Sequence, residues 1–252
     1  MRRRLSALRT RLAPLADRPE PQPAREPEPD HPAPLDREGQ DNRNFELLLG
    51  FLLEEDSNCV EVGANEGRFL HHYRRRAPRG QHFAWEPVPH LAERLRELFP
   101  GIEVHQAAVG DASSEETSFV VVKDDPAYSG LRRRAYPGDY QTEEITVRVE
   151  RLDEELPADY VPTLIKIDVE GGELGVLRGA SETIMRHRPL IVFEHGPGAS
   201  DRYGTTPEAI HDLVCGDFGM RMFDMDATGP LSRDQLVELY RTGSRWNYVA
   251  RV

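Results

Sequence analysis

The chain has 252 residues, enough for one domain of ordinary size with an appendage. Its 32 basic residues stand against 44 acidic ones, and this excess argues against non-specific binding to nucleic acid. The sequence has no apolar run long enough to span a membrane, and its two cysteines lack a metal or disulfide spacing. Its basic N-terminus lacks the apolar segment of a secretory signal, so the sequence favours a cytoplasmic α/β protein. The sequence does not indicate an oligomeric state.

Residues 1–43 differ in composition from the rest. Between residues 14 and 40 the chain has eight prolines and few apolar residues, so it cannot bury enough surface to offset its ordering entropy. Ahead of this stretch, four leucines recur at helical spacing among arginines: Leu5, Leu8, Leu12 and Leu15. That pattern suits weak contact with a membrane surface or an acidic partner; a disordered tip that touches nothing is the alternative. The sequence therefore predicts a disordered Arg- and Pro-rich extension over 1–43 and a folded domain over 44–252.

From residue 44 onward, helical and extended patterns alternate. Helices are predicted over 44–55, 66–76, 90–99, 173–186, 207–215 and 232–240. Strands are predicted over 59–63, 82–86, 102–109, 118–122, 145–152, 163–170, 190–195, 220–225 and 246–252. Repeated strand–helix units imply an α/β fold with a mostly parallel sheet and helices on both faces. Ligands of such sheets bind at the carboxyl ends of the strands.

The first predicted strand ends in a glycine turn that contains Gly63, Asn65 and Gly67. Asn65 replaces the second glycine of a dinucleotide fingerprint, and the third glycine of that fingerprint is missing. The carboxylates of Glu61 and Glu66 lie beside the turn and would repel phosphate. This turn therefore favours a cationic or zwitterionic ligand over a pyrophosphate.

The second predicted strand ends at Glu86, 19 residues after Gly67, where an acid can bind a ribose diol. S-adenosylmethionine has a ribose, an adenine and a sulfonium but no phosphate, so it matches these charges better than NAD does. A plain turn followed by a solvated glutamate is the alternative.

A segment without clear periodicity, 123–143, separates two later strands. Long irregular loops in compact domains are often lids. Tyr128 and Ser129 could contact an acceptor here, and Arg132 with its two neighbouring arginines could clamp a carboxylate or phosphate. A solvated arginine run is the alternative interpretation.

Two further strand ends carry charged residues. Lys166, Asp168 and Glu170 alternate along the predicted strand 163–170, so we expect them to share one face. Charges in a central strand are rare unless paired or functional, and a local ion pair is the alternative. Glu194 and His195 end the next strand. Together these residues form a candidate acid–base site; no tight ligand spacing supports a metal, so none is expected.

Three runs resemble the FkbM family of methyltransferases: VEVGANEGRF (60–69), FAWEPVP (83–89) and LIKIDVEGGELGVLRGA (164–180). The resemblance covers residues 44–252. It implies a class I methyltransferase fold, with a seven-stranded Rossmann-like sheet, and S-adenosylmethionine as the cofactor. Most family members methylate hydroxyls of sugars, polyketides or other natural products, so a small-molecule or glycan acceptor is expected.

The resemblance also implies roles for individual residues. The methionine and ribose portions of the cofactor would contact Glu61, Gly63, Ala64, Asn65 and Gly67. The ribose hydroxyls and the adenine would contact Glu86, Pro87, Ala107 and Ala108. Asp168 would stand beside the methyl donor, with Glu170 opening the next helix. From the residues themselves we expect a catalytic set of Lys166, Asp168, Glu170 and His195, with Asp168 or His195 as the base. We likewise expect the acceptor to contact Tyr128, Ser129, Arg132 and Glu194. An NAD(P)-dependent oxidoreductase and a non-catalytic methyltransferase-like binding protein remain as alternatives.

Overall fold

The structure, a computed structural model, describes residues 35–252 except 135 and 137. Asp36–Val252 forms one compact unit. Predictions for residues 1–34, including the leucine–arginine segment and most of the prolines, lie outside the described residues. Within the described part, no helix is both long and apolar enough to cross a bilayer.

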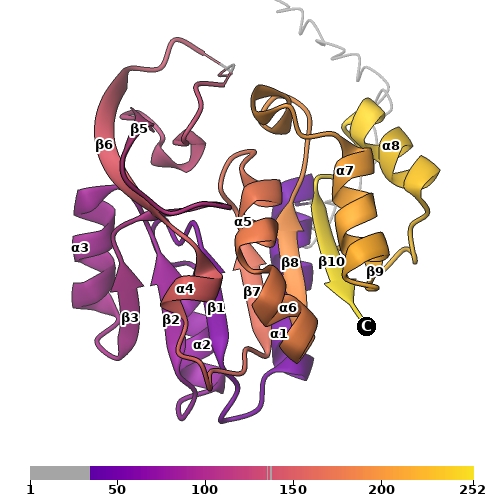
Figure 1. Ribbon diagram of the computed structural model, residues 1–252, viewed down its shortest axis with the longest axis horizontal. Helices are drawn as coiled ribbons and strands as arrows, with labels where there is room; N and C mark the ends of the chain where they lie inside the picture. Colours follow the sequence, from indigo (N-terminus) through magenta and orange to yellow (C-terminus); the bar gives the residue numbers. More distant parts are fainter. Residues whose placement is uncertain (1–34, 135, 137) are drawn as a thin grey trace, which may run out of the picture. The chain divides into compact units, whose positions relative to one another are not determined.

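A seven-stranded sheet forms the centre of the described unit (Figure 1). Its strand order is β3-β2-β1-β7-β8-β10-β9, and only β10 runs antiparallel to its neighbours. The chain order reverses between β1 and β7, which is where a ligand crevice is expected in a doubly wound sheet. Its strands are β1 (Cys59–Val62), β2 (His82–Trp85), β3 (Ile102–His105), β7 (Leu164–Ile167), β8 (Leu190–Glu194), β9 (Arg221–Asp224) and β10 (Asn247–Arg251).

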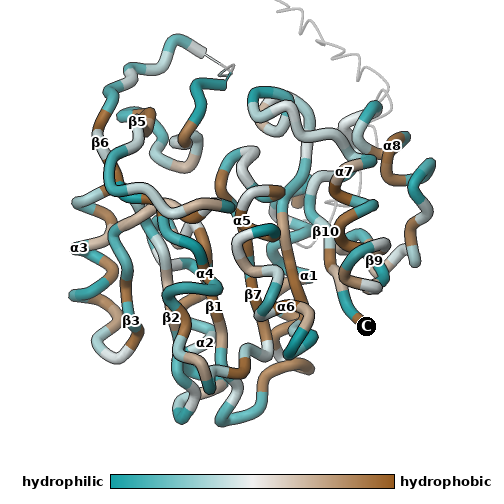
Figure 2. Tube along the Cα trace, in the orientation of Figure 1, coloured by the Kyte–Doolittle hydropathy of each residue, from teal (hydrophilic) through white to brown (hydrophobic). Residues whose placement is uncertain are grey.

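Helices cover both faces of this sheet, as predicted, with α1 and α2 behind it and α5 and α6 in front in Figure 1. Side chains of a strand point alternately to the two faces, so Val60 and Val62 enter one apolar core while Cys59 enters the other. Figure 2 shows the hydrophobic residues concentrated along the central strands. The helices are α1 (Arg37–Leu52), α2 (Leu70–Arg76), α3 (Pro89–Leu98), α4 (Leu152–Glu155), α5 (Glu173–Gly179), α6 (Ser181–His187), α7 (Pro207–His211) and α8 (Arg233–Thr242).

A second, three-stranded sheet of order β4-β6-β5 rises above the first (Figure 1). It contains β4 (Ala108–Val109), β5 (Ser114–Val122) and β6 (Thr142–Glu150). The single strand predicted over 102–109 is therefore wrong. The chain leaves the main sheet after β3, and β4 pairs with β6 instead.

Two other predicted boundaries differ from the structure. The first helix begins at Arg37 rather than at residue 44, because the Asp36 side chain caps it by accepting a hydrogen bond from the Gly39 amide at 2.8 Å. The predicted strand 163–170 ends as β7 at Ile167. Glu170 (φ 57°) and Gly171 (φ 107°) then turn the chain sharply. Only one of the three alternating charges therefore belongs to a strand.

Candidate active site

A cavity of about 730 Å³ lies at the carboxyl ends of β1, β2, β7 and β8. Its volume is within the usual range for small-ligand sites. Besides the strand ends, α1 and the short 3-10 helix η1 (Pro126–Tyr128) contribute to its wall.

The cavity brings together residues predicted to contact the methionine and ribose, the adenine and the acceptor, together with predicted catalytic residues. Twelve predicted site residues line it: Gly63, Asn65, Glu86, Pro87, Ala107, Ala108, Tyr128, Ser129, Lys166, Asp168, Glu170 and Glu194. Five predicted residues are not part of its lining: Glu61, Ala64, Gly67, Arg132 and His195.

The turn after β1 brings two strand ends into close contact. Gly63 has φ 81°, and a Cβ there would lie 1.8 Å from the Asp168 carbonyl oxygen. Only glycine therefore allows the β1 turn to approach the end of β7 this closely. The amides of Gly63 and Ala64 both donate to the Trp85 carbonyl at 3.0 Å, which fixes the turn against β2.

Glu86, directly after β2, presents a fixed carboxylate to the cavity. Its Oε2 accepts a hydrogen bond from the backbone amide of Asn65 at 2.8 Å, and its Oε1 accepts one from the backbone amide of Val88 at 2.9 Å. Glu86 is 4% exposed, and this burial raises its pKa to about 7, although both amides favour the ionised form. The nearby Oδ1 of Asn65 is buried and accepts no hydrogen bond from the described residues. Each Glu86 oxygen keeps a further acceptor position for a ligand hydroxyl.

Lys166 joins two carboxylates across neighbouring strands. Its Nζ lies 3.1 Å from Asp168 Oδ2 and 3.7 Å from Glu61 Oε1. Burial lowers the pKa of Lys166, but the two carboxylates raise it by more than burial lowers it, so the ammonium stays charged. Glu61 lies opposite Lys166 in the register and is fully enclosed, which raises its pKa to about 7. The structure therefore places Glu61 against the lysine and outside the cavity lining.

Asp168, Glu170 and Glu194 converge in the cavity, with one carboxylate oxygen of each within 4.8 Å of the others. Burial tends to raise the pKa of Asp168, but Lys166 and Glu194 hold it below its usual range. Burial and the Asp168 charge raise the pKa of Glu194 well above its usual range. Asp168 is therefore the ionised member of the pair. The three oxygens are close enough to share a hard cation.

His195 is separated from this carboxylate group. Neighbouring residues of an extended segment point to opposite sides, so Glu194 faces the cavity and His195 does not. The His195 ring is buried, stacks on Tyr240 at 4.8 Å and has Nδ1 3.0 Å from Ser200 Oγ. Burial lowers its pKa to about 4. The expectation of an imidazole at the acid–base site is therefore corrected.

The arginine that reaches the cavity is Arg134, not Arg132. Arg134 forms an ion pair with Glu170, and its guanidinium lies 5.1 Å from the centre of the Tyr128 ring. Arg132 is exposed and Arg133 donates to Thr142 Oγ1 at 2.6 Å. Three adjacent arginines look alike in sequence, and only the path of the loop selects one of them.

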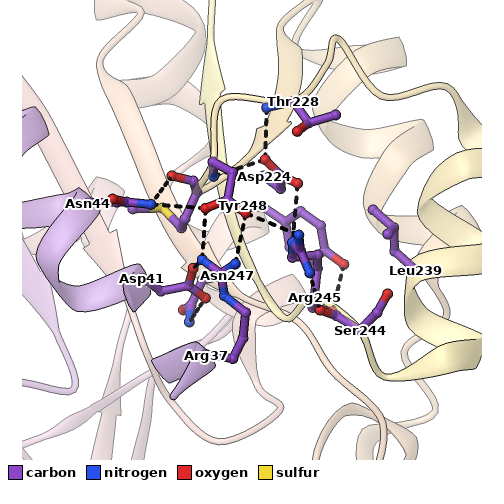
Figure 3. Close-up of polar contacts among 12 residues, drawn as sticks. Arg37, Asp41, Asn44, Asp224, Thr228, Leu239, Ser244, Arg245, Asn247 and Tyr248 are labelled. Carbon is purple, nitrogen blue, oxygen red and sulfur yellow. Dashed lines mark hydrogen bonds and ion pairs between the residues drawn. The ribbon is translucent and has the colours of Figure 1, made fainter. Parts of the chain in front are cut away.

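The first half of α1 also forms part of the cavity wall, which the sequence did not predict. Its lining residues are Glu38, Asp41, Asn42 and Phe45. Figure 3 shows how this half of the helix is fixed to the C-terminal part of the chain. Asn247 Nδ2 donates to Asp41 Oδ2 at 3.1 Å, and Asn44 Nδ2 donates to the Met225 carbonyl at 2.9 Å. The Asp36 cap followed by an acid in the first turn was the available sequence signal.

The model of the FkbM methyltransferase domain matches residues 61–221, more than half of the chain. The chain belongs to the FkbM methyltransferase family. Members of this family use S-adenosylmethionine, so the predicted family and cofactor are both confirmed. Together with the seven-stranded, mostly parallel sheet, this membership confirms the class I methyltransferase fold.

Several relatives are similar over part of their length. Methyltransferase 1 of Beauveria bassiana is 31% identical over 152 residues, which are 51% of this chain and 60% of that protein. The AMB antimetabolite synthetase AmbE of Pseudomonas aeruginosa is 26% identical over 204 residues, 66% of this chain and 10% of that protein. The chain thus spans about three fifths of the first and a tenth of the second. The crystal structure of methyltransferase FkbM from Methylobacillus flagellatus has a TM-score of 0.48 at 17% identity and covers 79% of this chain and 44% of its own.

The residues of the cavity fit the family's cofactor. The fixed carboxylate of Glu86 and the unpaired Oδ1 of Asn65 can accept hydrogen bonds from the ribose hydroxyls. Ala107 and Ala108 offer a small apolar surface for a base. Acidic residues around the β1 and β2 ends suit a ligand with a sulfonium and no phosphate.

Proposed function

We propose that this FkbM-family chain transfers a methyl group from S-adenosylmethionine to a hydroxyl oxygen of a small-molecule or glycan acceptor. One observation carries the proposal: Glu86 and the Lys166–Asp168 pair face the same cavity at the switch point of the sheet. The first provides a ribose-binding carboxylate, and the second provides an ionised base. The acidic excess of the chain again argues for a small acceptor rather than nucleic acid.

The chain's own residues have separate tasks in this reaction. Glu86 and Asn65 bind and orient the cofactor, which when bound supplies a sulfonium-activated methyl group. Because that methyl is already activated, correct positioning of the acceptor oxygen provides much of the rate. Asp168 accepts the hydroxyl proton on a carboxylate oxygen, and Lys166 keeps that carboxylate ionised. Glu194, whose pKa is raised by burial and by the Asp168 charge, can hydrogen-bond a polar group of the acceptor.

The proposal is tested by calorimetric titration of the full chain with S-adenosylhomocysteine, and separately with NAD and NADP. We expect micromolar binding of S-adenosylhomocysteine alone, weakened at least about tenfold by Glu86→Ala because the ribose hydroxyls lose a charged acceptor. Glu66→Ala is the matched control, since this carboxylate of the same turn is exposed and lies outside the cavity lining. If the protein bound NAD or NADP but not S-adenosylhomocysteine, the proposal would be refuted.

A further inference from the structure

The cavity wall is strongly acidic. Eight of its lining residues carry carboxylates: Glu38, Asp41, Glu86, Asp111, Asp125, Asp168, Glu170 and Glu194. Three carry cations: Lys166, Arg134 and Arg178. S-adenosylmethionine brings a sulfonium, an ammonium and a carboxylate, a net charge of about +1. A large excess of acidic groups therefore remains when the family's cofactor is bound.

Two of the three cations of the wall are already engaged, whereas Arg178, exposed on α5, forms no ion pair with a described residue. Lys166 pairs with Asp168 and Glu61, and Arg134 pairs with Glu170. Glu194 forms no ion pair with any residue that the structure describes. It therefore offers a carboxyl group to a ligand cation.

A second carboxylate increases the negative charge beside Glu194. Glu173 is 1% exposed; its Oε1 accepts the Gly171 amide at 2.9 Å, and its Oε2 has no hydrogen-bond donor among the described residues. Its charge is one of the causes that raise the pKa of Glu194. Glu173 itself is not part of the cavity lining, but a cation beside Glu194 would still offset part of the cost of burying both groups.

Near Tyr128 the cavity wall combines an aromatic ring with carboxylates. Tyr128 and Tyr140 stack with ring centres 5.8 Å apart. Burial and the neighbouring Tyr140 raise the pKa of Tyr128 most, and the charges of Asp125 and Glu38 raise it further. Arg134 lies over the Tyr128 face at 5.1 Å. This wall thus already binds one organic cation of the protein itself, between a ring face and a carboxylate.

The arginine run 132–134 provides no clamp for an acceptor carboxylate or phosphate. None of the three consecutive arginines offers an unengaged guanidinium to the cavity: Arg132 is outside it, Arg133 bonds Thr142, and Arg134 pairs with Glu170.

We propose that the acceptor carries a positively charged amino group in addition to its hydroxyl, bound between Glu194 and the aromatic wall at Tyr128. This inference rests on the proposed methyl transfer and narrows its substrate class to amino alcohols, aminosugars and similar amines. The hydroxyl is then directed to Asp168, while the ammonium hydrogen-bonds the Glu194 carboxyl and offsets the charge of the acidic residues around it.

The experiment uses the full chain saturated with S-adenosylhomocysteine and three phenols that differ in charge. Tyramine is cationic, N-acetyltyramine is neutral and 3-(4-hydroxyphenyl)propionate is anionic. We expect calorimetry to show tyramine binding at least about tenfold more tightly than N-acetyltyramine, with no detectable binding of the propionate. Glu194→Gln should abolish this preference, while the matched exposed control Glu66→Gln should retain it.

Equal or tighter binding of the neutral or anionic phenol would overturn the inference, as would failure of all three to bind a protein that binds S-adenosylhomocysteine. Magnesium, titrated alone, provides the remaining test. If it binds through Glu194 and excludes tyramine, the missing cation is inorganic and the inference is wrong. Failure of S-adenosylhomocysteine itself to bind would instead refute the proposed function, and this inference with it.

Discussion

At the scale of single residues, Asp168 owes its properties to its neighbours. Burial raises the pKa of its carboxyl, but Lys166 at 3.1 Å and Glu194 hold that pKa below its usual range. The protein therefore maintains an ionised carboxylate base in a cavity that no histidine of the described residues lines.

Asp168→Asn should lower kcat by about 100-fold or more because the amide cannot accept the hydroxyl proton. The affinity for S-adenosylhomocysteine should change little, since Asn preserves the shape of the side chain. Tritium transfer from S-adenosylmethionine to an acceptor found by screening measures the first effect, and calorimetry the second. His195→Ala serves as the comparison: if it reduced the single-turnover rate as strongly while the protein stayed folded, our assignment of the base would be wrong.

Glu173 gives a prediction about stability and pH. Burial raises its pKa to about 7, so the folded protein binds a proton here that the unfolded chain releases at lower pH. This contribution is present at low pH and is lost as pH rises from about 4.5 to about 7, by about 3 kcal/mol for a shift of this size. Glu173→Gln keeps the acceptor for the Gly171 amide but cannot ionise.

Relative to the unmodified chain, Glu173→Gln should therefore gain stability steadily between pH 5 and pH 8. Urea unfolding at several pH values measures the difference. Glu182→Gln, on the exposed side of α6, is the control and should run parallel to the unmodified chain. A Glu173→Gln difference that does not vary with pH would show that this carboxyl is ionised throughout.

At the scale of elements, α1 completes the cavity because polar contacts attach its first half to the β9–β10 region (Figure 3). Arg37 bonds Asp226 at 2.8 Å, and Asn44 bonds both Asp226 Oδ1 at 3.0 Å and the Met225 carbonyl. Met225 and Asn247 belong to the cavity lining themselves. The helix position and the cavity shape are therefore coupled.

Asn44→Ala should lower the free energy of unfolding by about 1–2 kcal/mol, because the side-chain hydrogen bonds to Met225, Asp226 and Gln40 are lost at a partly buried position. It should also weaken the binding of S-adenosylhomocysteine or acceptor by loosening the wall. Arg43→Ala, at an exposed position of the same helix, should change the free energy of unfolding by no more than about 0.5 kcal/mol. Urea unfolding and calorimetry measure both variants. Equal effects of the two substitutions would mean that the docking contacts are dispensable.

The small sheet is fixed to the main sheet by one buried acid. Glu150 of β6 accepts the Trp85 indole N–H at 2.8 Å and lies 2.9 Å from His105 Nδ1. Trp85 lines the cavity directly before Glu86. Glu150 therefore links the small sheet to β2, directly before Glu86, and to β3.

At the scale of the whole molecule, ligand binding should appear as stability. Saturation at about 100 times the Kd adds about 2.7 kcal/mol, which corresponds to a rise in Tm of about 5–10 °C for a domain of this size. S-adenosylhomocysteine should produce this rise and NAD should not. Differential scanning calorimetry measures it, with Glu86→Ala as the variant in which the rise is reduced. A rise with NAD alone would favour an oxidoreductase instead.

The sequence by itself determined what depends on local pattern. Apolar runs and helical spacing located the strands and helices of the main sheet, because each pattern reflects which faces of an element are buried. The glycine turn at Gly63 and the acids at Glu86 and Asp168 could be placed at strand ends, since parallel strands end at one edge. The family resemblance rested on the same runs and predicted the fold and the cofactor.

Only the tertiary structure decided which of these groups meet. It placed Glu61 against Lys166, turned His195 away from the cavity and brought Arg134 instead of Arg132 to Glu170. It also moved β4 into a second sheet and made the start of α1 a wall of the cavity. These outcomes depend on contacts between segments far apart in the chain, whose partners no local pattern specifies.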